Sequence, residues 1–359
     1  MKGRQVTRNQ LDEAGERLLY AGLRRYWHPV LLAAELSDAP QAVTLLGERV
    51  VVVRLGGTVA ALRDLCIHRG SALSVGKVID GDKLQCAYHG WTYDGEGRCL
   101  RIPARPGMAI PAKARVQRYE AAEHVGLIWV CLEGPPAMPL PEFPEYGDPA
   151  YHVIRIPTYD WRCGAARRLE NFVDVAHLPF LHEGVLGDPR RPEVPRYQVT
   201  RDATTLKFAA GLEAQPGNPY KHDDQDSSTL VPREPIHYTI QMPFTVHLAQ
   251  PLPDGKRYTL FMTACPVTDK LTRTFSFGGR NYDKDPGRDA EYVDYQHVIL
   301  EQDRRVVETQ RPEELPVDLA AELHIGQVDR ASVDYRKWLA EIARSQRQQA
   351  RKAPQTAAR

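Results

Sequence analysis

The organisation of this chain follows from residues 65–91, LCIHRGSALSVGKVIDGDKLQCAYHGW. This stretch contains the pair Cys66-x-His68 and, after seventeen intervening residues, the pair Cys86-x-x-His89. A glycine follows each pair within two residues, as Gly70 and Gly90. Core or disulfide cysteines do not require two such Cys/His pairs. The pattern therefore predicts a metal centre with two thiolate and two imidazole ligands.

Two kinds of metal centre accept two Cys and two His ligands. Zinc sites usually place Cys with Cys and His with His at their short spacings. In a Rieske [2Fe-2S] cluster one iron takes both thiolates and the other iron takes both imidazoles, so each loop supplies one ligand of each kind. The spacing therefore predicts a Rieske cluster held by Cys66, His68, Cys86 and His89.

The two loops also indicate which kind of Rieske cluster to expect. High-potential respiratory clusters have an additional Cys in each loop, and the two form a bridge. The corresponding positions here are Ser71 and Tyr88. Because exposure and hydrogen bonds to the sulfurs tune the potential, we expect a value toward the low end of the Rieske range.

Length and composition limit the class of protein. A chain of 359 residues is long enough for about two domains, and a hydrophobic content of 42% supports a sizeable core. A net charge of +1 favours neither a nucleic acid nor an anionic membrane as partner. We find no apolar run of membrane-spanning length and no signal segment, so we expect a soluble cytoplasmic protein. Four further cysteines are expected to be buried free thiols: Cys99, Cys131, Cys163 and Cys265.

The distribution of patterns along the chain predicts an α+β protein in four parts. Helical spacing near the start indicates a helical segment over residues 1–40. Short β-branched runs separated by glycines predict an antiparallel β domain over residues 41–135 that contains the cluster loops. A proline-rich linker then opens a second domain over residues 136–340. Residues 341–359 are polar and basic, which predicts a disordered tail.

A second group of polar residues begins soon after the linker. On a helix, Asn171, Asp174 and His177 would step by three and stay near one face. Pro179 is expected to break or kink that helix, so that His182 reaches back toward His177. Two imidazoles and one carboxylate form the usual site for non-haem iron in oxygenases. Histidines near a proline are also common in cores and on surfaces, but a cluster in the same chain favours the metal site.

The third ligand is expected from a later helix. Asp174 is better placed to orient an imidazole than to complete the triad. A helical run that ends before Pro312 has an apolar stripe, and Asp303 falls on that stripe. A buried carboxylate is costly unless it is paired or binds a metal, so we select Asp303. A salt bridge to another residue is the alternative explanation.

With these two ligand sets, the chain resembles the α subunit of the Rieske non-haem iron oxygenases. Within that family it is most similar to the branch of vanillate O-demethylase, toluenesulfonate methyl-monooxygenase and the methylxanthine N-demethylases. The resemblance covers most of the chain and includes the stretches RRYWHPV (24–30), GLIWV (126–130), LENFVDVAHLPFLH (169–182), EQDRRVVETQRPEELP (301–316) and VDYRKWL (333–339).

The resemblance implies a fold and a ligand set. The cluster ligands would be Cys66, His68, Cys86 and His89, and the mononuclear Fe2+ would be held by His177, His182 and Asp303. The fold would be an N-terminal Rieske domain followed by a catalytic domain of the helix-grip type, with helices over an antiparallel sheet.

The resemblance also implies how electrons move. Asp174 would hydrogen-bond to His177 and to the His89 of a neighbouring subunit, which requires a head-to-tail ring and suggests a homotrimer. Electrons would come from NAD(P)H through a ferredoxin or an iron-sulfur flavin reductase, and O2 would be the co-substrate. Asn171 would either help to shape the site or be an ordinary helix residue, and the sequence leaves both open.

The region after His182 is expected to form a sheet that surrounds a small substrate. Strands are expected in the segments 237–248, 256–267 and 272–280, and the first two alternate in polarity. Which face lines the pocket does not follow from this alternation. Candidates for pocket residues are Phe208, Met242, Phe244 and His247, although core packing is the preferred explanation for the apolar ones. His247 would either bond a polar group of the substrate or have a structural partner. The polar loop 214–235 is a candidate lid.

The basic residues Arg69, Lys77, Lys83, Arg98, Arg101 and Arg105 suggest a docking surface for an acidic electron donor near the cluster. The second ligand set argues against a simple electron carrier or a zinc-binding interaction module. The resemblance to the α-only branch favours oxidative O- or N-demethylation or C-H monooxygenation of an aromatic or heterocyclic compound. Ring cis-dihydroxylation and C-H hydroxylation in a natural-product pathway are the alternatives.

Overall fold

The computed structural model describes residues 8–217 and 229–352. The chain separates into two compact units, which we describe one at a time. The smaller unit contains residues 24–140 and 265–268, and the larger unit contains residues 1–23, 141–264 and 269–359.

The smaller unit is built on two antiparallel sheets. The first contains, in sheet order, β1 (His28–Leu32), β10 (Leu127–Cys131), β9 (Arg118–His124), β4 (Thr58–Arg63), β3 (Glu48–Leu55) and β2 (Gln41–Leu45). The second contains β5 (Lys77–Ile79), β6 (Lys83–Gln85), β7 (Thr92–Tyr93) and β8 (Cys99–Arg101). The two Cys/His loops lead into β5 and β7 of the second sheet. This arrangement confirms the antiparallel hairpins expected from the β-branched runs.

A small apolar core supports the two loops. Val51, Val53 and Leu62 of the first sheet pack with Leu84 and Tyr93 of the second sheet, and all five side chains are buried. The side chains of Cys66 and Cys86 belong to the same cluster. Each loop is thus held in place by its buried cysteine, while other parts of the loop stay exposed.

The larger unit is a seven-stranded antiparallel sheet with helices. In sheet order the strands are β11 (His152–Trp161), β19 (Thr272–Arg280), β18 (Arg257–Pro266), β17 (Thr245–Pro251), β16 (Ile236–Gln241), β13 (Thr205–Ala210) and β12 (Val199–Arg201). A separate pair is formed by β14 (Ala214–Pro216) and β15 (Leu230–Pro232). The helices are α1 (Arg8–Leu23), α2 (Ala165–Val173), α3 (Leu178–Leu181), α4 (Asp289–Val307) and α5 (Arg330–Lys352).

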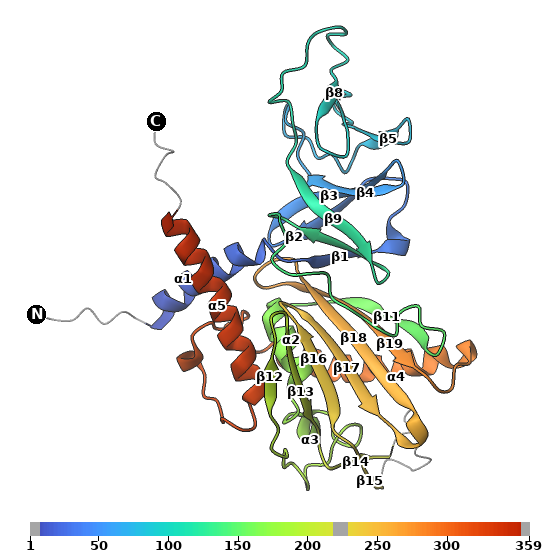
Figure 1. Cartoon of the computed structure of the whole chain (residues 1–359), viewed down its shortest axis with the longest axis vertical. Helices are drawn as coiled ribbons and strands as arrows, with labels where there is room; N and C mark the ends of the chain where they lie inside the picture. The colour runs from blue at the N-terminus through green and yellow to red at the C-terminus, as the bar shows by residue number, and fades with distance from the viewer. Residues whose placement is uncertain (1–7, 218–228, 353–359) are drawn as a thin grey trace, which may run out of the picture. The chain divides into compact units, whose positions relative to one another are not determined.

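The helices of the larger unit pack on the sheet or on one another. Figure 1 shows α4 lying across one face of the sheet, and α4 also contacts α2. Helices α1 and α5 pack against each other, and the space at Gly22 of α1 is so small that an added Cβ would lie 2.8 Å from Ile342 of α5. Helices over an antiparallel sheet confirm the predicted α+β class.

Three boundaries differ from the sequence-based expectation. The N-terminal helical segment ends at Leu23 rather than at residue 40, because β1 pairs with β10 and completes the first sheet. Helix α5 continues to Lys352, past the expected start of a disordered tail at residue 341, because Ile342 and Ala343 are buried. The segment 237–248 contains parts of two strands, β16 and β17, which meet at a turn.

Two smaller expectations can also be compared with the structure. All six cysteines are free and buried, as expected for the four that lie outside the cluster loops. Within residues 8–217 and 229–352, none of the helices combines the length and the apolar character needed to cross a bilayer. The centre of the candidate lid, residues 218–228, lies outside the described residues.

The turn at Gly97 provides a test of the smaller unit. Gly97 has a φ of +76°, and an added Cβ would lie 2.3 Å from the carbonyl oxygen of Val116. Gly57 has a φ of +81° but no atom within 4 Å of the Cβ position. Gly57→Ala should therefore lower the free energy of unfolding by about 1–2 kcal/mol, from backbone strain alone.

Gly97→Ala should cost clearly more than Gly57→Ala, because it adds a clash with backbone to the same strain. Urea unfolding monitored by circular dichroism measures both variants. Equal losses of stability in the two variants would contradict the close approach of Val116.

Candidate metal centres and active-site cavity

The two loops of the smaller unit have closely similar backbones. In the first loop the N-H of Gly70 donates to the carbonyl of Cys66, and in the second loop the N-H of Gly90 donates to the carbonyl of Cys86. Both glycines have a positive φ, of 72° and 68°. Glycine adopts this conformation without strain, which explains why one follows each Cys/His pair.

The four side chains fall into an inner and an outer pair. Cys66 and Cys86 are buried, each with 2% of its surface exposed. His68 and His89 are exposed and adjacent, with ring centroids 4.5 Å apart. Two inner sulfurs and two outer imidazoles match a cluster in which one iron takes thiolates and the other takes imidazoles. The residues present therefore fit a Rieske cluster.

Ionisation in the loops depends on burial and on one tyrosine. Burial raises the pKa of the Cys66 thiol, and a hydrogen bond between its sulfur and the Tyr93 hydroxyl, 3.1 Å away, partly opposes this effect. Desolvation and the neighbouring His89 lower the pKa of His68. A neutral imidazole is the form that binds a metal, so His68 is suited to a ligand role.

The basic residues proposed as a docking surface are only partly available. Lys83 is paired with Asp80 and Asp82, and Arg98 is paired with Asp94. The side chains of Arg69, Lys77, Arg101 and Arg105 are exposed. The positive charge near the loops is thus smaller than the sequence suggested.

The second group of polar residues is not arranged on one helix, which corrects the sequence-based expectation. Helix α2 ends at Val173, and Asp174 caps it in an extended conformation with φ −77° and ψ 127°. His177 is the residue before the short helix α3, and His182 is the residue after it. Pro179 lies in the first turn of α3, where a proline is tolerated, instead of breaking a longer helix.

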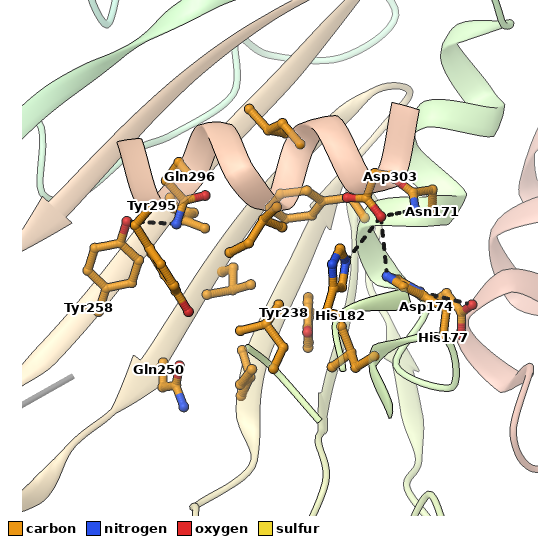
Figure 2. Close-up of a pocket in the computed structure, with 18 of the residues that line it drawn as sticks. Asn171, Asp174, His177, His182, Tyr238, Gln250, Tyr258, Tyr295, Gln296 and Asp303 are labelled. Carbon is orange, nitrogen blue, oxygen red and sulfur yellow. Dashed lines mark hydrogen bonds and ion pairs between the residues drawn. The ribbon is translucent and has the colours of Figure 1, made fainter. Parts of the chain in front are cut away.

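The structure nevertheless brings both histidines to Asp303 of α4. The Nε2 atom of His182 lies 3.2 Å from Asp303 Oδ1, and the Nε2 atom of His177 lies 3.5 Å from the same oxygen. Ligand atoms of the three residues all lie within 4.8 Å of one another. At usual metal-ligand distances of about 2.0–2.2 Å, one ion can contact all three. Figure 2 shows the three side chains converging at one end of a cavity.

Each member of this triad is held by a neighbouring polar group. Gln302 Oε1 lies 2.7 Å from His182 Nδ1, and Asp174 Oδ2 lies 3.2 Å from His177 Nδ1. Such acceptors place the proton on Nδ1 and leave Nε2 free to bind a metal. Asn171 Nδ2 donates to Asp303 Oδ1 at 3.0 Å.

Asp303 is ionised despite its burial. Burial raises the pKa of this carboxyl, but the close approach of His182 and the nearby charge of Arg168 outweigh that effect, so the pKa lies below its ordinary value. Arg168 itself is fixed by hydrogen bonds to Asn171 and to the Tyr159 hydroxyl. A buried carboxylate beside two imidazoles is the donor set of a non-haem iron site.

The cavity beside the triad has an empty volume of about 740 Å³, including space that is open to solvent. Its lining residues come from the α2–α3 region, from β14 and β16–β18, and from α4. They are Arg168, Asn171, Phe172, Asp174, His177, Leu178, His182, Leu186, Gln215, Ile236, Tyr238, Leu248, Gln250, Tyr258, Leu260, Tyr295, Gln296, Ile299, Leu300 and Asp303.

None of the four pocket candidates from the sequence lines this cavity, so that expectation is corrected. Phe208 lies behind the wall and stacks on Tyr238 with centroids 4.7 Å apart. Met242 and Phe244 are buried near the β16–β17 turn. His247 neighbours the lining residue Leu248 on β17, so it points to the other face, where its Nε2 lies 3.0 Å from Glu145.

Asp174 and His177 are also accessible from outside the cavity. The side chain of Asp174 is 35% exposed and that of His177 is 19% exposed. Both line a second hollow on the surface, together with Leu323 and His324. Leu323 is 89% exposed and apolar. His177 of the triad therefore borders both the buried cavity and the exposed hollow.

Four residues of these sites escaped the sequence analysis. Three of them lie close in sequence to a predicted site residue, which could have indicated them. Gln302 directly precedes Asp303, Arg168 lies three residues before Asn171, and Tyr93 lies four residues after His89. Gln250 had no such signal, because it lies in a strand far from any motif.

Comparison with known proteins gives the family. Residues 26–120 match the model of the Rieske [2Fe-2S] domain, and residues 161–345 match the vanillate O-demethylase oxygenase C-terminal domain. The chain is 34% identical to the methylxanthine N1-demethylase of Pseudomonas putida over 331 residues, which is 89% of each protein. It is also 34% identical to the N3-demethylase of P. putida over 337 residues, 90% of each.

Solved structures agree with these matches. The structure of NdmA from P. putida CBB5 with caffeine superposes with a TM-score of 0.81 and 33% identity, covering 92% of this chain and 94% of that one. Dicamba monooxygenase has the same fold, with a TM-score of 0.75 at 22% identity. Members of this family are oxidoreductases that carry a [2Fe-2S] cluster and a mononuclear iron. The chain therefore belongs to the Rieske non-haem iron oxygenases, as an oxygenase α subunit.

Proposed function

We propose that this oxygenase removes a methyl group from nitrogen or oxygen of a small aromatic or heterocyclic compound. The observation that carries the proposal is the triad of His177, His182 and Asp303, the last two of them buried, which opens onto a largely apolar cavity. The N-demethylase relatives that align over most of the chain support the reaction type, and a shorter match to dicamba O-demethylase agrees with it.

The same geometry supports a proposed set of metal ligands. His177, His182 and Asp303 would hold the mononuclear iron, which supplies the site for O2 activation when bound. Cys66, His68, Cys86 and His89 would hold the cluster. The residues that keep the iron ligands oriented are Gln302, Asp174 and Asn171, because each accepts from or donates to one member of the triad.

The reaction has a simple balance. One methyl C-H bond and O2, with two electrons and two protons, give a hydroxymethyl group and water. The hydroxymethyl compound then breaks its bond to nitrogen or oxygen and releases formaldehyde. The chain's own contribution is to position the methyl group at the triad and to exclude water, for which the apolar walls of the cavity are suited.

We further propose that Asp174 links the triad to a cluster in a second copy of the chain. Its exposed carboxylate is bonded to His177 on one side, and it faces the second hollow on the other. On the smaller unit His89 is exposed beside Tyr88, which is 61% exposed. A head-to-tail homotrimer would join these two surfaces.

Electrons would reach the cluster from a separate NAD(P)H-dependent reductase, through a ferredoxin or an iron-sulfur domain of a flavin reductase. The exposed Arg69, Lys77, Arg101 and Arg105 would attract such an acidic donor. A cytoplasmic location would give the reductase access to NAD(P)H.

Dihydroxylation of a ring is the second candidate. A 213-residue match to the 3-chlorobenzoate-3,4-dioxygenase oxygenase subunit of Comamonas testosteroni, at 32% identity, favours it. One experiment separates the two reactions. The loaded protein is reduced under argon with dithionite, N-methyl heterocycles and aromatic methyl ethers are added, and air is admitted. Demethylation gives formaldehyde in a 1:1 ratio to demethylated product, whereas a diol without formaldehyde would replace the proposal.

Asp174→Asn tests the link between the centres. The amide keeps an oxygen for the N-H of Ala176 but removes the negative charge beside His177. Iron and cluster contents should stay unchanged, while product formed per reduced cluster should fall by at least about tenfold to a hundredfold.

Single-turnover measurements with quantified metal content test Asp174→Asn directly, and Asp160→Asn is the control because Asp160 lies in an exposed pair with Arg273. Full activity of Asp174→Asn would remove the proposed electron route.

Gln302→Leu tests the orientation of His182. Loss of the acceptor at Nδ1 should weaken iron binding by about tenfold to a hundredfold, without changing the visible absorption of the cluster. Competition with a chelator measures the iron affinity. Gln302→Glu retains an acceptor at this position, so this variant should bind iron at least as tightly as the unaltered protein does. Unchanged affinity in Gln302→Leu would show that this hydrogen bond is dispensable.

A further inference from the structure

The cavity has two chemically different ends. Among its described lining residues, every group that is charged or binds metal lies around the triad, namely Arg168, Asp174, His177, His182 and Asp303. The opposite end contains neutral polar side chains, which are Gln250, Gln296, Tyr258 and Tyr295. A substrate that reaches across the cavity therefore meets the iron site at one end and amides and phenols at the other.

The sheet register explains how the neutral end is assembled. Gln250 of β17 pairs directly with Tyr258 of β18, and Leu248 pairs with Leu260 in the same ladder. Residues two apart on a strand share a face, so all four side chains point toward α4. Gln296 of α4 donates from Nε2 to the Tyr258 hydroxyl at 3.2 Å. Figure 2 shows Gln250, Tyr258 and Gln296 grouped away from the triad.

Gln250 has an unused donor at this end. Its side chain belongs to a residue that is 2% exposed, and in the described part of the chain nothing accepts a hydrogen bond from its buried Nε2. A buried N-H without an acceptor is costly, and such groups in native proteins usually have a partner. Because Gln250 lines the cavity, an oxygen atom of a bound molecule can supply that partner.

The neutral end offers no counter-charge for an anion. Arg168 is the one cation among the described lining residues, and its guanidinium is occupied by Tyr159 and Asn171 and stacks over Trp161 at 4.5 Å. Burial raises the pKa of Tyr258, so its hydroxyl stays neutral. A carboxylate placed here would lose its water without gaining an ion pair, which is strongly unfavourable.

The length of the cavity limits the size of the ligand. Gln296 precedes Asp303 by seven residues on α4, which corresponds to about 10 Å along the helix axis. The walls between them include the apolar Ile299 and Leu300 of α4 and Leu260 of β18. This space suits a flat compound of one or two rings, with a methyl group at the triad and a polar edge at Gln250.

We propose that the cavity selects a neutral ring compound whose carbonyl oxygen accepts a hydrogen bond from Gln250 Nε2, and that it rejects aromatic carboxylates. Cyclic amides with an N-methyl group have this chemistry. The inference rests on the proposed demethylation, and it makes Gln250 a residue that determines specificity.

The first experiment uses ligands that differ in charge but hardly in shape. Binding of 4-methoxybenzamide and 4-methoxybenzoate to the fully loaded protein is measured by calorimetry without O2, and 1,3-dimethyluracil serves as the cyclic amide. The amide and the uracil should each bind at least about a hundredfold more tightly than the benzoate. Equal or tighter binding of the benzoate would overturn the proposal.

The second experiment changes the donor. Gln250→Leu and Gln250→Glu should each weaken binding of 1,3-dimethyluracil by about tenfold to a hundredfold, because the first lacks a donor and the second places a carboxylate against the carbonyl. Gln327→Leu, at an exposed position outside the cavity, should leave the affinity unchanged. Iron content and melting temperature verify that each variant is folded. Unchanged affinity in both Gln250 variants would contradict the assignment.

These measurements separate the two proposals, since binding without O2 does not depend on turnover. Neutral ligands that bind through Gln250 but release no formaldehyde would support the cavity assignment and remove demethylation. Rapid release of formaldehyde from 4-methoxybenzoate would support demethylation and overturn the selection for neutral compounds.

Discussion

The structure of the larger unit depends on one constraint, the burial of Asp303 against two imidazoles. A carboxylate with 6% of its surface exposed is stable only with partners, and here His177, His182 and Asn171 converge on it. These partners come from the α2–α3 region, whereas Asp303 comes from α4, so α4 must pack closely against the α2–α3 region. The sheet beneath α4 completes the enclosure and forms the remaining walls of the cavity.

The same arrangement separates two routes to the triad. The buried route is the cavity. Its charged groups surround the triad, and Gln250 and Gln296 lie at its opposite end. The exposed route passes Asp174, whose carboxylate is accessible from the surface. In the proposed function a substrate uses the first route and electrons use the second. This separation would keep the substrate shielded from water while an electron donor approaches.

Short spacings in the sequence predicted residues that the structure brings together, whereas they did not predict the long-range packing. Cys66, His68, Cys86 and His89 were selected from their spacing, and the Rieske domain match agrees with the type of centre. The expected single helix through His177 was wrong, because Asp174 leaves the helical conformation, yet both histidines still meet Asp303. The pocket candidates failed because alternation identifies two faces of a strand without saying which one faces α4. His247 and Leu248 differ by one residue and lie on opposite faces.

The sequence by itself determined the chemistry that is local along the chain: two Cys/His loops with glycines at positive φ, two histidines five residues apart, and a carboxylate on an apolar helix stripe. These features depend on residue type and on the geometry of a few adjacent peptides. Tertiary structure alone decided that Gln302 orients His182, and that Gln250 and Gln296 meet at Tyr258. Such groupings arise because strand register and helix docking bring distant side chains to one face of the sheet. The spacing of residues within one strand does not reveal which face that is.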